Sequence, residues 1–353
     1  MPGSPPPSLE LIVDRVDERL TALLRTERER WAALNPELGH PIDEIARLVM
    51  SGGKRLRPAF CHWGYVGAGG ATDDQIDIDA GGALELMHAM ALFHDDVMDD
   101  AATRRGQPTT HSLSAAEHAR EAWAGESRRF GEGVAILVGD LAFVYADQLL
   151  EGAPVAATRV WNELRIELNI GQYLDIVGSV QRLRSVEKAE QISRYKSGKY
   201  TIERPLHLGA VLAAPDDADV LVPALSAYGL PLGDAFQMRD DVMGAFGDAE
   251  TTGKPVGGDL REGKPTPLLA RAAQAATPAQ LEVLDLVGDT KMSDTSVANI
   301  QQVIIDTGAL DELERHISEL TEIAVASLKA APITEIAKTE LIALAEYVSS
   351  RSA

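Results

Sequence analysis

Residues 80–100 have the sequence AGGALELMHAMALFHDDVMDD, and the interpretation of the whole chain starts from them. Residues 80–93 are apolar and rich in alanine, which predicts a buried helix. The helix ends in a block of four carboxylates, Asp95, Asp96, Asp99 and Asp100. Like charges at helical spacing repel one another, so this helix end needs a compensating cation. Asp95 and Asp99 lie on one helix face with Asp96 beside them, and such hard oxygen ligands suit Mg²⁺ together with substrate phosphates.

Composition favours a helical protein with a substantial core. The chain has 353 residues, of which 45% are hydrophobic and only 5% aromatic. Alanine and leucine dominate and β-branched alternation is scarce, which favours an all-α fold over a sheet protein. The 54 acidic and 33 basic residues leave a formal charge of −21, which argues against nucleic acid or an anionic membrane as the main partner.

The compartment is predicted from what the sequence lacks. A single cysteine, Cys61, excludes an intrachain disulfide and a cysteine-based metal site, and fits a reduced cytoplasmic compartment. The Pro-rich start lacks the features of a signal peptide, and no apolar run approaches the roughly 18 residues of a transmembrane segment. We therefore expect a soluble cytoplasmic protein.

Helical periodicity predicts the remaining elements. The expected helices cover 9–34, 42–50, 58–67, 80–93, 133–150, 155–180, 185–213, 220–247 and, as a C-terminal group, 268–350. We expect loops at 103–109 and irregular chain at 112–132. No shift in composition marks a boundary, so the prediction is a disordered tail at 1–8 and one domain at 9–353.

Two basic segments are candidates for anion binding. Lys54, Arg55 and Arg57 follow Gly52-Gly53, a pattern that suits a turn with exposed backbone amides that cradle an anion, or simply a solvated basic loop. Arg104 and Arg105 follow the Asp block, either as its counter-ions or as guanidinium forks for diphosphate oxygens.

The acidic helix end occurs twice. Asp240-Asp241 also ends an apolar helix, and Lys254 and Lys264 follow it as Arg104 and Arg105 follow the first block. Two such helix ends at the mouth of one cavity would clamp several Mg²⁺ ions around a diphosphate.

With these segments in place, the chain resembles the trans-isoprenyl diphosphate synthases, also called the polyprenyl synthetase family, and is most similar to their actinobacterial geranylgeranyl diphosphate synthases. The matching segments keep the family's order: Gly52-Gly53-Lys54-Arg55-Leu56-Arg57-Pro58, Glu85-Leu86-Met87-His88, Asp95-Asp96-Val97-Met98-Asp99, Thr103-Arg104-Arg105-Gly106, Gln172, Lys196-Ser197, Phe236-Gln237, Asp240-Asp241, Thr252-Gly253-Lys254-Pro255 and Asp259-Leu260-Arg261-Glu262-Gly263-Lys264.

The resemblance implies an isoprenoid synthase fold, a single all-α bundle of roughly a dozen helices around a deep central cavity, usually as a homodimer. It implies Mg²⁺-dependent head-to-tail condensation of isopentenyl diphosphate with an allylic diphosphate, with about three Mg²⁺ ions per site. By the same resemblance the metal ligands are Asp95, Asp96, Asp99, Asp240 and Asp241. Arg104, Lys196 and Lys254 contact the allylic diphosphate, Lys54, Arg57, His88 and Arg105 hold isopentenyl diphosphate, Ser197 and Gln237 line the allyl group, and Lys264 is a further substrate-binding residue.

One position departs from the family pattern. The second motif commonly has the form Asp-Asp-x-x-Asp, and here Gly244 takes the last position. Asp248 is the nearest remaining carboxylate, and its role is open.

The turns before Asp95 indicate the product length. Leu84 lies about 16 Å from Asp95 along the helix axis. Relatives that stop at fifteen carbons often carry aromatic residues just before the first Asp, whereas Met90 and Ala91 stand here. The short-chain bacterial relatives also often carry a two-residue insertion in the first motif, which this chain lacks. We predict a C20 product, with Leu84, Met87, Met90 and Ala91 as chain-length residues.

Three alternatives remain. Glu85-x-x-His88 matches half of a di-iron site in a helical bundle, but such a site needs a second motif. A class I terpene cyclase also uses an Asp-rich helix end, without the basic loop at 54–57. A non-catalytic subunit of a heteromeric synthase would be expected to lose one Asp pair.

Overall fold

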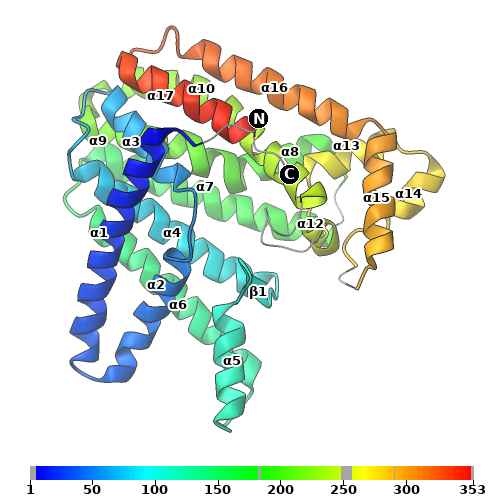
Figure 1. Ribbon diagram of the computed structural model, residues 1–353, viewed down its shortest axis with the longest axis horizontal. Coiled ribbons are helices and arrows are strands. Elements are labelled where there is room, and N and C mark those ends of the chain that lie inside the picture. The colour runs from blue at the N-terminus through cyan, green and yellow to red at the C-terminus, as the bar shows by residue number, and fades with distance from the viewer. Residues whose placement is uncertain (1–4, 182–183, 248–256, 290, 351–353) are drawn as a thin grey trace. The chain divides into compact units, whose positions relative to one another are not determined.

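The computed structural model describes residues 5–181, 184–247, 257–289 and 291–350, and this part of the chain is almost entirely helical (Figure 1). The predicted all-α fold class is therefore confirmed. Within the described residues the β-structure is confined to one short hairpin. The first helix begins at Pro7, and residues 1–4 of the predicted tail lie outside the described residues.

The chain forms two compact units, which we describe separately. The first unit comprises residues 7–62 and 72–153, and the second comprises 1–6, 63–71 and 154–353. The helix α3 (Leu56–Gly67) begins in the first unit and ends in the second. The single domain expected for 9–353 stays a prediction.

The first unit is built around α4. Its elements are α1 (Pro7–Ala32), η1 (Pro36–Gly39), α2 (His40–Val49), the start of α3, α4 (Ile76–Met98), β1 (Thr103–Arg104), β2 (Gln107–Pro108), α5 (Thr110–Arg120) and α6 (Ser127–Leu149). A Cβ at Gly81 would lie 3.1 Å from Pro58 Cβ, and one at Gly82 would lie 3.0 Å from a Leu149 methyl group. These two glycines therefore let α4 pack closely against its neighbours.

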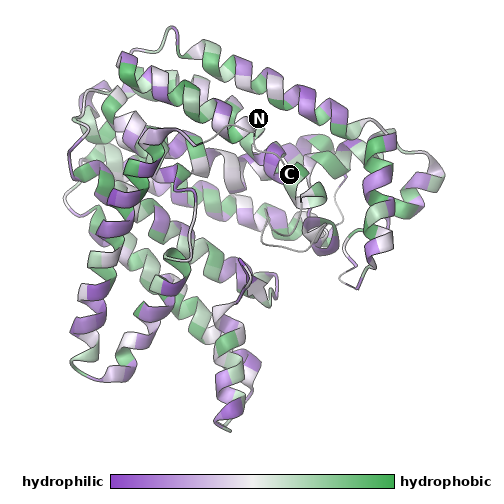
Figure 2. Cartoon of the chain, viewed as in Figure 1, coloured by the Kyte–Doolittle hydropathy of each residue, from purple (hydrophilic) through white to green (hydrophobic). Residues whose placement is uncertain are grey.

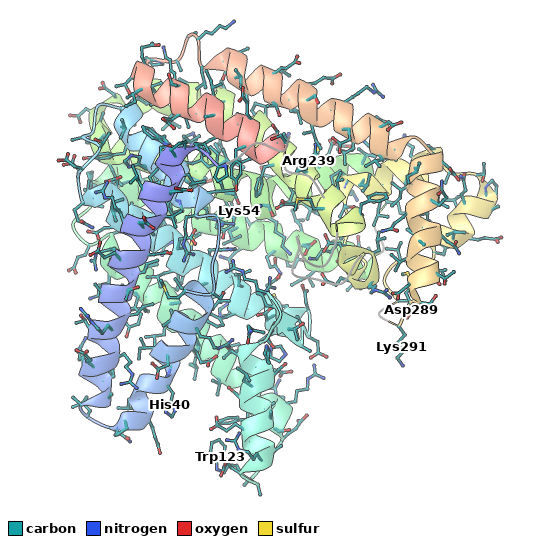
Figure 3. All side chains as sticks on the ribbon, viewed as in Figure 1. His40, Lys54, Trp123, Arg239, Asp289 and Lys291 are labelled. Carbon is teal, nitrogen blue, oxygen red and sulfur yellow. The ribbon has the colours of Figure 1, made fainter. Side chains whose placement is uncertain are left out.

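The second unit is built around the long helix α10. Its elements are α7 (Val155–Val180), α8 (Val186–Ser193), η2 (Arg194–Glu203), α9 (Arg204–Ala213), η3 (Pro215–Asp217), α10 (Ala218–Phe246), α12 (Gly258–Glu262), α13 (Pro267–Ala275), α14 (Pro278–Leu284), α15 (Asp294–Asp306), α16 (Ala309–Ser327) and α17 (Glu335–Ser349). Hydrophilic and hydrophobic residues mix along α16, as expected of a helix with one buried face (Figure 2). Arg239 of α10 binds both Glu314 carboxylate oxygens of α16 at 2.6 Å (Figure 3), which joins the two helices.

Three segments differ from the predicted elements. The segment expected as one helix at 185–213 is divided by η2, a π-helix, a rare helix type that occurs frequently at functional sites. The segment 112–132, expected to be irregular, contains α5 and the start of α6. There His118 and Phe130 pack their rings 5.1 Å apart, so tertiary contacts stabilise helices whose sequence pattern is weak.

The loop expected at 103–109 contains the hairpin β1–β2. Its turn residues Arg105 and Gly106 have φ angles of 51° and 72°. Positive φ at both central residues is the geometry of a type I′ hairpin turn, which matches the twist of the flanking strands.

Candidate active site

The carboxylates at the end of α4 bind an arginine from the hairpin that follows. Arg104 Nε donates to Asp96 Oδ1 at 2.6 Å, and Arg104 Nη2 donates to Asp95 Oδ2 at 3.2 Å. Asp96 is 4% exposed, whereas Asp99 lies exposed beyond the end of the helix. Arg104 is thus the built-in counter-ion of this helix end, one of the two roles that the sequence left open.

Burial and charge act in opposite directions on these groups. Burial raises the pKa of Asp96, and the Arg104 charge offsets only part of that rise. Burial disfavours the charged form of Arg104, but the carboxylates of Asp96 and Asp95 outweigh it and raise the Arg104 pKa. Asp96 is therefore a desolvated carboxylate that a cation stabilises.

Hydrogen bonds from Thr109 close the chain on either side of the hairpin that carries Arg104. Thr109 N donates to Ala102 O at 3.1 Å, and Thr109 Oγ1 donates to Ala101 O at 2.8 Å. These bonds close the segment that joins α4 to α5, so Arg104 lies next to the carboxylates at little entropic cost.

The basic loop between α2 and α3 divides its three cations between two tasks. Arg55 is buried and binds Asp17 at 2.8 Å and Glu85 at 2.7 Å, so it stabilises the fold. Lys54 is exposed (Figure 3), and Arg57 is partly exposed on the first turn of α3. Arg55 is thus the partner of the buried Glu85 carboxylate. The burial of Glu85 therefore needs no iron ion, although Glu85-x-x-His88 matches half of a di-iron site.

Arginines surround His88 of α4. Burial lowers the pKa of His88 well below its usual value, and the charges of Arg57, Arg105, Arg104 and Arg55 lower it further. His88 is therefore neutral at physiological pH. Arg105 also donates to Ser51 Oγ at 3.1 Å and to the Gly52 carbonyl, which ties the hairpin to the basic loop.

A cavity of ≈ 350 Å³ lies beside these cations. Its lining includes Asp96, Arg104 and Arg105 together with Arg47 and Ser51. Within the first unit, the structure thus brings together the Asp96 carboxylate and several cations at a cavity large enough for a phosphorylated ligand.

The predicted chain-length residues lie on α4 before these carboxylates. Leu84 and Met87 are fully buried, Met90 is 7% exposed, and Ala91 is partly exposed. Leu84, His88, Ala91 and Asp95 follow one another at intervals of three and four residues, so they share a helix face. No Phe, Tyr or Trp occupies that face between Leu84 and Asp95.

In the second unit, α7 positions Lys196. A Cβ at Gly171 would lie 2.3 Å from the Lys196 backbone N, so only glycine lets η2 approach α7 this closely. One turn further along α7, Asp175 accepts a 2.6 Å hydrogen bond from Lys196 Nζ. The sequence had assigned no role to Asp175. Ser197 follows Lys196 on η2 and is partly exposed.

The second acidic helix end has a different environment. Asp241 is 5% exposed, and its Oδ1 accepts from Gln237 Nε2 at 3.1 Å. Its Oδ2 has no hydrogen-bond partner within the described residues. Burial raises the pKa of Asp241 well above its usual value, and the nearby Asp259 and Asp240 charges raise it further.

Two lysines were predicted near this helix end. Lys264 binds Glu262 at 2.9 Å and Asp259 at 3.4 Å. Lys254 and Asp248 lie outside the described residues.

The donor sets at both helix ends fit a hard divalent cation. They offer only carboxylate oxygens, and at Asp241 one buried oxygen has no protein partner. Within the described ranges, no group of three or more His, Cys, Asp or Glu side chains already converges as a metal site. Carboxylates converge poorly without a cation because they repel one another, so Asp95, Asp96, Asp99, Asp240 and Asp241 stay the predicted ligands.

The comparisons with known proteins agree with the resemblance. The profile of the polyprenyl synthetase family matches residues 40–304. The chain belongs to the polyprenyl synthetase family. It is therefore a prenyltransferase, as predicted.

The similar proteins differ in their products. A crystal structure of geranylgeranyl pyrophosphate synthase from Corynebacterium glutamicum, complexed with isoprenyl diphosphate and magnesium, is 37% identical, with a TM-score of 0.90 over 97% of this chain and 99% of that chain. Geranylfarnesyl diphosphate synthase from Aeropyrum pernix is 31% identical over 86% of this chain and 92% of its own length. Farnesyl diphosphate synthase from Escherichia coli is 32% identical over 88% and 97%.

These findings confirm the all-α isoprenoid synthase fold and the similarity to actinobacterial geranylgeranyl diphosphate synthases. Among the described helices, none has the length and hydropathy needed to cross a membrane.

Proposed function

We propose that the chain condenses isopentenyl diphosphate head-to-tail with an allylic diphosphate and that its main product is geranylgeranyl diphosphate. The observation that carries the C20 product is the face of α4 before Asp95, where Leu84, His88 and Ala91 leave the first turns without a Phe, Tyr or Trp side chain. The similarity to the Corynebacterium glutamicum enzyme supports the same product.

We propose that three Mg²⁺ ions bind with the diphosphate, held by Asp95, Asp96, Asp99, Asp240 and Asp241. Bound there, they stabilise the negative charge that develops as the allylic C–O bond ionises. All five side chains are oxygen donors, and Asp96 and Asp241 are buried carboxylates that gain most from a cation.

The basic residues hold the two diphosphates. Arg104, Lys196 and Lys254 contact the allylic diphosphate, and Lys264 is a further substrate contact. Lys54, Arg57, His88 and Arg105 hold isopentenyl diphosphate. A neutral His88 donates one hydrogen bond without adding charge to the arginines around it.

The apolar turns of α4 exclude water from the allylic cation. Ser197 and Gln237 line the reacting allyl group. Isopentenyl diphosphate attacks the cation, and the released pyrophosphate removes the proton that restores the double bond.

We also propose a homodimer. The helix α6 exposes Leu137 at 69% and Val144 at 61%, seven residues apart on one face, with Phe130 a further seven residues before them. Light scattering should show a dimer, and Leu137→Glu should shift it toward monomer. Val220→Glu, at a residue that is 59% exposed on α10, is the matched control and should leave the dimer intact.

The decisive test incubates the purified chain with Mg²⁺, isopentenyl diphosphate and, separately, dimethylallyl, geranyl or farnesyl diphosphate. Chromatography should show a C20 product that disappears when a chelator removes the metal. A product of another length would overturn the C20 proposal alone. Failure to consume isopentenyl diphosphate would favour a cyclase or a non-catalytic subunit.

A further inference from the structure

Gly244 lies against a carboxylate from a different helix. A Cβ placed on Gly244 would lie 1.8 Å from Asp259 Oδ2 and 2.5 Å from Asp259 Cγ. The Asp259 carboxylate therefore occupies the space that a side chain at position 244 would fill. Any residue other than glycine would have to displace it.

This space lies beside the carboxylates of α10. Gly244 follows Asp241 by three residues and Asp240 by four, so all three positions face the same side of the helix. Asp241 is buried, and its Oδ2 lacks a hydrogen-bond partner within the described residues. The helix face thus presents a buried oxygen without a protein partner among the described residues, next to a carboxylate that α12 supplies.

The short helix α12 is anchored firmly enough to fix Asp259. Leu260 is 1% exposed and belongs to the same core cluster as Val242 of α10. The Leu260 carbonyl accepts from Gly288 N at 2.9 Å, and Arg261 binds Asp294 of α15 at 2.7 Å. The position of Asp259 is therefore set by the core and not by loop conformation.

Lys264 completes the local arrangement. It lies 3.4 Å from Asp259 Oδ1 and 2.9 Å from Glu262 Oε2. Lys264 thus neutralises part of the Asp259 charge through Oδ1, and Oδ2 is the Asp259 oxygen nearest Gly244.

We propose that Asp259 supplies the third carboxylate of the α10 metal site, in the place that Gly244 vacates in the motif. The inference rests on the proposed metal-dependent function, which it deepens by naming a ligand outside both Asp motifs. The sequence alone pointed to Asp248, the nearer residue along the chain. Asp259 lies fifteen residues after Gly244, a separation that linear spacing does not connect with the motif.

The first test is the affinity for Mg²⁺, measured by calorimetry with inorganic pyrophosphate present. Asp259→Asn, which keeps the side-chain shape, should weaken the affinity by about tenfold or more. Glu262→Gln makes the same charge change at the other partner of Lys264 and should stay within about twofold of the parent. Equal affinity in Asp259→Asn and the parent would overturn the proposal, as would a loss seen only in Asp248→Asn.

The second test exchanges the two positions. Gly244→Asp combined with Asp259→Gly moves the carboxylate back onto α10 and should restore Mg²⁺ affinity to within about threefold of the parent. Gly244→Ala combined with Asp259→Gly fills the same space without a carboxylate and should stay about tenfold weaker. If both exchange variants fold, as circular dichroism would show, and bind Mg²⁺ equally, the proposal is wrong. If they do not fold, the single Asp259→Asn variant decides.

The metal measurement needs no turnover, so the two proposals can fail separately. A chain that makes no prenyl product but loses Mg²⁺ affinity in Asp259→Asn would contradict the proposed function alone. A chain that makes the C20 product with unchanged Mg²⁺ affinity in Asp259→Asn would contradict the Asp259 ligand alone.

Discussion

The helices α4 and α10 both carry paired carboxylates in their last two turns, but they stabilise these charges in different ways. At α4, Arg104 binds both Asp95 and Asp96. At α10, Asp241 accepts one hydrogen bond from the neutral Gln237, and its second oxygen has no partner among the residues that the structure describes. The first helix end thus has an arginine bound to both carboxylates, whereas at the second one buried Asp241 oxygen is left to a proton or a metal ion.

The same difference between the two helix ends affects the pKa shifts of Asp96 and Asp241. Burial raises the pKa of both Asp96 and Asp241, but Arg104 counteracts the rise at Asp96. At Asp241 the neighbouring Asp259 and Asp240 charges add to the effect of burial. A carboxylate whose folded-state pKa is raised stabilises the fold below its unfolded pKa, and this contribution is lost as pH rises through the folded pKa. The metal-free protein at neutral pH therefore carries an electrostatic cost at α10.

The largest expected effect comes from removing one carboxylate at each end. Asp95→Asn and Asp240→Asn should each lower kcat/KM by about 10²–10³, because each removes several kcal/mol of charge stabilisation from the transition state. Steady-state kinetics at saturating Mg²⁺ measures this. If both ends act on one diphosphate, the double variant should lose less than the product of the two single losses. Full activity in either variant would show that the two helix ends do not contribute equally to catalysis.

The next largest effect distinguishes the role of Arg104 from that of the metal ions. Arg104→Ala should lower kcat/KM by about 10–100-fold, because a charge-assisted contact with the diphosphate is lost. The same variant should bind Mg²⁺ more tightly than the parent when no diphosphate is present, because Asp95 and Asp96 lose their competing cation. Arg128→Ala, which removes an exposed arginine bound to Glu132, is the control for a simple change in net charge. Weaker Mg²⁺ binding in Arg104→Ala would contradict the role of Arg104 as a counter-ion.

Stability without metal should change in opposite directions at the two ends. In the presence of a chelator, Asp241→Asn should raise the free energy of unfolding by about 1 kcal/mol, because a neutral amide replaces a buried carboxylate. Asp96→Asn should lower it by about 1–3 kcal/mol, because Arg104 loses its closest partner. Denaturant unfolding at neutral pH measures both. If the free energy of unfolding changes in the same direction in both variants, the two helix ends do not differ in how they stabilise their carboxylates.

The smallest effect on rate concerns the product. Ala91→Phe should shorten the main product while turnover stays within about tenfold, because the ring blocks the face that leads away from Asp95. Leu92→Phe places the same ring about 100° around α4 and is the matched control. Chromatography of the products checks this, and an unchanged distribution in Ala91→Phe would remove Ala91 from the chain-length residues.

The sequence by itself determined the features that depend on spacing within one element. Residues 80–93 were predicted as a buried helix that ends in carboxylates, and α4 has this form because apolar periodicity decides which face is buried. The duplication at Asp240-Asp241 was equally visible, and the order of the motifs identified the family.

Only the tertiary structure decided which charges lie together. Lys54, Arg55 and Arg57 form one basic run, yet Arg55 is buried against Asp17 and Glu85, whereas Lys54 is exposed. The contact of Lys196 with Asp175 depends on the close approach of η2 to α7 at Gly171, and the place of Asp259 beside Gly244 depends on the anchoring of α12. The physical reason is that spacing along a helix determines its own faces, while contacts between distant elements follow from how their cores pack.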